Sequence, residues 1–97
     1  MNRRKLEREI AQVITRVLPL VPKNATVGKK EFETIHAEIL RCVHDKTKTS
    51  MDSIVEKVDT VLKALPSEYG CLPEDQRSWE ALIGYLYARY LKELGKL

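Results

Sequence analysis

The sequence is poor in the residues from which most recognisable active sites are built. Its 97 residues include only four glycines, two histidines and two cysteines. The glycines are scattered at positions 28, 70, 84 and 95, so no glycine-rich loop is available to wrap a phosphate group. Cys42 and Cys71 form no CxxC pair and are too few for a disulfide framework, and whether they pair depends on the fold bringing them together. We expect Cys42 to act as a small hydrophobic residue on a helix, in a reducing compartment.

Metal-binding and catalytic patterns are also incomplete. Glu33 and His36 match half of the Glu-x-x-His signature of di-metal helical bundles. The second copy is missing, because Arg41 stands three residues before His44. Neither cysteine has a base in its sequence context that would activate it. The sequence therefore favours a protein that is not an enzyme and that uses no metal, cofactor or small-molecule substrate.

Long apolar runs are absent as well. No stretch without a charged residue approaches the roughly 20 residues that span a membrane. The basic start of the chain is not followed by a short apolar segment ending in small residues, as a secretory signal would be. Glu7 and Glu9 argue against a transit peptide, which avoids acidic residues. We expect a cytoplasmic protein that makes no membrane contact.

What the chain does contain is helical periodicity. In four segments the apolar residues recur every three or four positions, which places them on one face of a helix. The predicted helices cover residues 3–18, 28–45, 51–65 and 73–94. Pro19 and Pro66 are expected to end helices and Pro73 to begin one, because proline suits only the first turn. Gly95 is a natural stop for the last helix.

Capping residues support these segments. Thr26 is expected to cap the second helix, and Thr49 or Ser50 the third. Glu74 and Asp75 fall in the predicted first turn of the fourth helix, where negative charge suits the helix dipole. Four amphipathic helices joined by short or moderate loops predict an all-α fold, a single-domain helical bundle spanning residues 1–97.

The predicted fourth helix has two different faces. Trp79, Tyr87 and Tyr90 share one face with leucines and are expected to be core, with their polar ends near the rim. The other face carries small residues and a tyrosine where a solvated helix usually has Glu, Lys or Gln. Small residues let another backbone approach closely, and tyrosine supplies contact area at little entropic cost. The predicted protein-contact residues are Ala81, Gly84, Tyr85, Ala88, Arg89 and Lys92.

Two other interpretations of this face stay open. In one, the fourth helix is central and packs against neighbours on two sides. In the other, its alanines are present only because they favour helix formation. If the face is exposed, the sequence predicts a binding protein, such as an inhibitor, adaptor or accessory subunit. Its partner would be another protein or a second copy of the chain.

Positive charge gathers at the front of the chain and suggests an alternative. Residues 1–30 carry eight Lys or Arg and two acids, whereas residues 31–60 carry four and seven, and the net charge is +3. A basic helix and the loop after it would suit a phosphate backbone contacted without reading its sequence. The alternative hypothesis is a nucleic-acid-associated protein with the contact residues Arg3, Arg4, Lys5, Arg8, Lys29 and Lys30.

Overall fold

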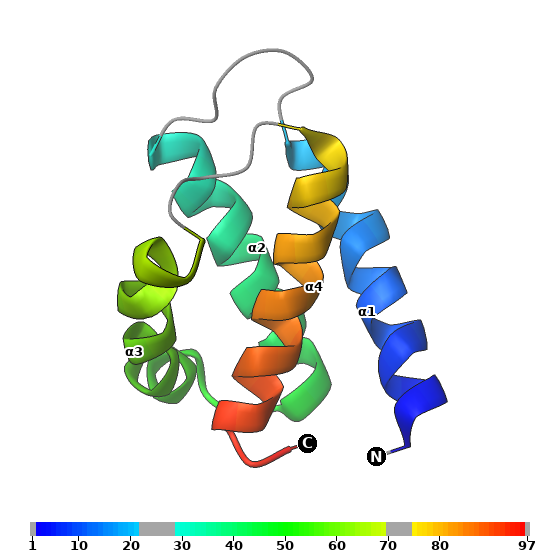
Figure 1. The fold of residues 1–97 in the computed structure, drawn as a ribbon. Helices are drawn as coiled ribbons and strands as arrows, with labels where there is room; N and C mark the ends of the chain where they lie inside the picture. The colour runs from blue at the N-terminus through cyan, green and yellow to red at the C-terminus, as the bar shows by residue number, and fades with distance from the viewer. Residues whose placement is uncertain (1, 22–28, 70–74, 97) are drawn as a thin grey trace.

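Four helices build the fold, and the predicted all-α bundle is confirmed (Figure 1). The computed structural model describes residues 2–21, 29–69 and 75–96, without the side chains of residues 29 and 64–69. Over those residues the elements are α1 (Arg3–Val17), the short 3-10 helix η1 (Leu18–Leu20), α2 (Lys29–Thr47), α3 (Met51–Tyr69) and α4 (Gln76–Glu93), with no strand. None of the helices in this described part is both long enough and apolar enough to cross a membrane.

Side chains and one glycine close the helix ends. Asn2 caps α1, because its side-chain oxygen accepts the Lys5 backbone N–H at 2.8 Å. Ser50 caps α3, as predicted, by accepting the Ser53 N–H at 3.3 Å. At the end of α4, Gly95 adopts a positive φ of 71° and the Lys96 N–H bonds the Leu91 carbonyl at 2.9 Å. This arrangement satisfies carbonyls of the last turn, and the prediction that Gly95 ends the helix is confirmed.

Three predicted boundaries are wrong by a few residues. α4 begins at Gln76, because Asp75 is its N-cap and accepts the Ser78 N–H at 2.8 Å. α2 continues through Thr47, whose hydroxyl donates to the Val43 carbonyl and so is satisfied within the helix. α3 continues past Pro66 to Tyr69, so the prediction that Pro66 ends this helix is wrong. The predicted cap Thr26 and the predicted start Pro73–Glu74 lie outside the described residues.

The core forms around α4, which packs against α1, α2 and α3. Trp79, Tyr87 and Tyr90 are its largest fully buried side chains. Burying a large apolar side chain stabilises a fold by about 1.5–3 kcal/mol, so this face of α4 contributes a large share of the stability. Cys42 is buried in the same core and has no disulfide, as expected of a small hydrophobic residue. α1 and α4 run in opposite directions, which brings the start of α1 and the end of α4 to the same end of the bundle (Figure 1).

Candidate functional site

The predicted contact face of α4 divides into a buried edge and an exposed edge. Gly84 is buried against α1: a Cβ atom built on it would lie 3.0 Å from Ile10 Cγ2 and 3.7 Å from Ile14 Cδ1. The close approach that this glycine permits is therefore made by a helix of the same chain. Gly84 offers no surface to a partner, contrary to the prediction, and on this edge α4 does pack as a central helix.

The other edge of α4 is accessible to solvent. Ala81 and Lys92 are exposed, and Tyr85, Ala88 and Arg89 are half-buried. Ala81, Tyr85, Ala88 and Lys92 follow one another at four-, three- and four-residue spacing, which aligns them along one side of the helix. Of the predicted contact residues, all except Gly84 therefore present some surface to solvent.

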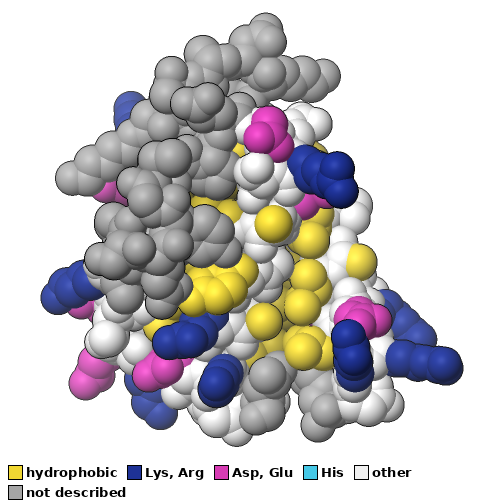
Figure 2. Space-filling model, viewed as in Figure 1, with side chains coloured by type: hydrophobic (Ala, Val, Ile, Leu, Met, Phe, Trp, Pro, Cys, Tyr) yellow, Lys and Arg dark blue, Asp and Glu magenta, His cyan; other side chains and the backbone are white. Residues whose placement is uncertain are grey.

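Half-buried residues of α1 extend this edge sideways. Ile10 and Ile14, which face Gly84, are partly exposed and pack on the edge of the core, as does Tyr85. We call the combined surface the α1–α4 strip, formed by Ile10, Ile14, Ala81, Tyr85 and Ala88. Figure 2 shows hydrophobic side chains gathered along this part of the molecule, over α4 and its border with α1.

The fold brings one basic residue from each predicted set, Lys92 and Arg4, to the same end of the strip. Gly84 lies level with Ile10 and Ile14. Eight residues later, Lys92 is about 12 Å further along α4, which in the antiparallel pair is the level of Arg4. Both side chains are exposed, and neither forms an ion pair with any residue that the structure describes. The protein-contact surface and the basic start of the chain are therefore parts of one region.

The remaining basic residues of the alternative hypothesis do not form a single cluster. Arg3 is exposed and bonds Glu7 at 3.2 Å, which partly neutralises it. Lys5 and Arg8 are exposed on α1. Lys30 is exposed near the start of α2, at the opposite end of the bundle from the start of α1 (Figure 1). The side chain of Lys29 lies outside the described residues.

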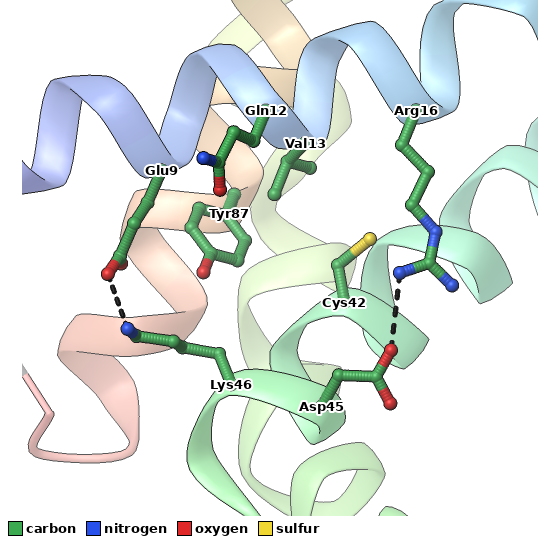
Figure 3. Close-up of a pocket in the computed structure, with 8 residues that line it drawn as sticks. All are labelled: Glu9, Gln12, Val13, Arg16, Cys42, Asp45, Lys46 and Tyr87. Atoms are coloured by element: carbon green, nitrogen blue, oxygen red, sulfur yellow. Dashed lines mark hydrogen bonds and ion pairs between the residues drawn. The ribbon is translucent and has the colours of Figure 1, made fainter.

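The other side of α1 borders a polar pocket of about 280 Å³ between α1 and α2 (Figure 3). Two ion pairs join the helices across it: Glu9 with Lys46, and Arg16 with Asp45 at 3.2 Å. In the first pair α1 supplies the carboxylate, and in the second it supplies the guanidinium group. Together the four groups have no net charge. The pocket is thus framed by two ion pairs, although one carboxylate oxygen of Glu9 has no hydrogen-bond partner among the described residues.

The groups at the back of this pocket are poor nucleophiles. Burial raises the pKa of the Cys42 thiol, and the positive charge of Arg16 offsets only part of this increase. Burial also raises the pKa of Tyr87 to about 12, with the negative charge of Glu9 adding to the shift. Both groups therefore stay protonated at neutral pH. This geometry suits a structural link between α1 and α2 better than a reaction centre.

A partly buried polar pair joins α2 to α4. The Tyr90 hydroxyl lies 2.7 Å from His36 Nε2, and the ring of Phe32 stacks on the imidazole. Tyr90 is fully buried, so the expectation that its polar end lies near the rim is wrong. Burial lowers the pKa of His36. The histidine considered for metal binding is a neutral partner of a tyrosine, and in the described residues no three His, Cys, Asp or Glu side chains gather as metal ligands.

The chain matches no protein-family model, no curated protein and no solved structure.

Proposed function

We propose that this protein is a non-enzymatic binding module that contacts another protein through the α1–α4 strip. The observation that carries the proposal is the continuity of the strip: five apolar residues from two helices leave surface exposed side by side. A contiguous apolar patch with a polar rim is typical of a protein-interaction surface. Among the described residues, the exposed large hydrophobic side chains Leu20 and Val55 lie on other elements, η1 and α3.

The residue types of the strip also suit such contact. Ala81 and Ala88 are small enough to let a partner backbone approach closely, and Tyr85 between them adds a large, rigid surface. The module would act as an inhibitor, adaptor or accessory subunit. We further propose that it acts in the cytoplasm, because Cys42 is a free thiol built into the core.

Site-specific photo-crosslinking in the native host tests this function. A photoreactive phenylalanine at Ala81 should give a covalent adduct of defined mass, whereas the same residue at the exposed Thr60 of α3 should not. Adding Ala88→Gln, which lengthens a side chain beside the probe without adding charge, should reduce the adduct. Equal adducts at both positions, or none at Ala81, would contradict the proposal.

Nucleic-acid binding is the second candidate, favoured by the exposed cations of α1. Arg4, Lys5 and Arg8 form no ion pair with any residue in the described part of the chain. If these residues contact phosphates, affinity for duplex DNA or RNA should fall steeply with salt. Arg4→Glu combined with Arg8→Glu should abolish it. Absence of binding at moderate salt would eliminate this candidate.

A further inference from the structure

The exposed side of α4 has apolar residues along its middle, with the half-buried Arg89 beside them, and a basic residue at each end. Arg77, Ala81, Tyr85, Ala88 and Lys92 recur at four-, four-, three- and four-residue spacing, so they form one stripe along the helix. Arg77 and Lys92 are 15 residues apart, which is about 22 Å along the axis. Both are exposed, and neither takes part in an ion pair with a described residue. The stripe therefore carries two cations that frame its apolar part.

At the end of the bundle where α1 begins and α4 ends, the surface carries a second cation near the level of Lys92. Arg4 lies at the level of Lys92, and the acid beside it, Glu7, is bonded to Arg3. At the other end, the exposed Glu80 stands three residues after Arg77 and so lies beside it on the helix, but the two form no ion pair. An occupant of the stripe would thus meet a cation at each end, with Glu80 offsetting part of the charge of Arg77.

The positive charge at both ends of the stripe argues against a second copy of the chain as the occupant. If two α4 stripes packed in parallel, Lys92 would face Lys92 and Arg77 would face Arg77. In the antiparallel arrangement, Arg77 would face Lys92 of the other copy. Like charges oppose each other in either case, which disfavours self-association through this face.

We propose that the stripe binds an acidic amphipathic helix of another protein. The helix lies along α4 with its apolar residues on Ala81, Tyr85 and Ala88, and with carboxylates about 22 Å apart on Arg77 and Lys92. This inference rests on the proposed function and adds the chemistry of the partner. Small residues in the middle of the stripe allow the close contact that helix-on-helix packing needs, and the terminal charge pairs fix the position of the helix along α4.

Two labelled peptides of 22 residues test the proposal by fluorescence anisotropy. Both carry leucines at three- and four-residue spacing, and they differ only in having glutamates or lysines at the two ends. The glutamate peptide should bind at least tenfold more tightly than the lysine peptide, and the difference should shrink as the salt concentration rises.

In the protein, Arg77→Glu combined with Lys92→Glu should weaken binding of the glutamate peptide about tenfold and favour binding of the lysine peptide. Lys30→Glu with Lys57→Glu, an equal change of net charge at exposed positions away from the stripe, should leave the peptide preference intact.

Each other outcome overturns the inference in a different way. Equal affinity for the two peptides would show that the partner need not be acidic, but would not contradict protein binding through the strip. Failure of both peptides to bind would exclude a helical partner, and the crosslinking experiment would then test the proposed function independently. Displacement of the glutamate peptide by a short DNA duplex at moderate salt assigns the surface to nucleic acid. A dimer that breaks up on Ala88→Gln assigns it to a second copy.

Discussion

The two sides of α1 are held to the bundle by different forces. On the α4 side, Ile10 and Ile14 pack directly on Gly84. The strength of this contact therefore depends on the volume of the side chains that meet there. On the α2 side, ion pairs such as Glu9–Lys46 and Arg16–Asp45 bridge the helices around a polar pocket. Packing tolerates little change in volume, whereas partly exposed ion pairs contribute modestly and are screened by salt. The apolar side of α1 is therefore the side more sensitive to a change in volume, and it is also the side that carries the exposed strip.

The largest expected effect comes from filling the contact between α1 and α4. Gly84→Leu should lower the free energy of unfolding by about 3 kcal/mol, because even its Cβ would meet Ile10 Cγ2 at 3.0 Å. Urea denaturation followed by circular dichroism measures this change. Ala81→Leu, an exposed position one turn earlier on the same helix, is the matched control and should change stability little. Equal stability of the two variants would show that Gly84 is not tightly packed against Ile10.

A smaller loss is expected at the junction of α2 and α4 when the pH falls. Burial lowers the pKa of His36 in the folded protein below its ordinary value of 6.5, so between these two values the unfolded chain binds more protons. Stability should be complete above pH 6.5 and should decline as the pH falls through the folded pKa. Urea denaturation between pH 7.5 and 5 measures the decline. In His36→Gln, which keeps a hydrogen-bonding group near Tyr90, the decline should be weaker, and an identical decline would exclude His36 as its source.

These contacts show which parts of the fold the sequence could predict. Periodicity was enough to place Trp79, Leu82 and Leu86 in the core, because local spacing alone decides which residues share a helix face. The ends of α2 and α4 were less predictable. Thr47 is held in the helix by its own hydroxyl bond, and Asp75 acts as a cap where it was expected inside the first turn.

The candidate site depended on topology that no local pattern contains. Gly84 and Tyr85 are neighbours in sequence, yet α1 covers the first and leaves part of the second open. Which of them is covered depends on where the first helix docks. In the same way, Arg4 and Lys92 come to one level only because α1 and α4 are antiparallel. The bond between His36 and Tyr90 joins residues 54 positions apart, and nothing in the sequence marked them as partners.

The polar side of α1 should respond less strongly than the packed side. Lys46→Met breaks the ion pair with Glu9, whose side chain is 12% exposed and which has one carboxylate oxygen with no hydrogen-bond partner among the described residues. We expect a loss of about 1 kcal/mol at low salt and less at 1 M NaCl, where the charges are screened. Lys57→Met removes an exposed lysine that forms no ion pair with the described residues and is the matched control. A loss as large as that of Gly84→Leu would mean that charge, not volume, holds α1 in place.

The smallest effect on stability should come from the exposed strip itself, and it separates folding from binding. Ala81→Gln adds a polar side chain at a position that is already exposed, so the free energy of unfolding should change by less than about 0.5 kcal/mol. The same change places extra volume where a partner backbone would approach, so binding of the glutamate peptide should weaken. Gly84→Leu should show the opposite pattern, since it acts on a contact inside the bundle. If Ala81→Gln destabilises the fold as strongly as it weakens binding, the strip belongs to the core and the division between the two edges of α4 is wrong.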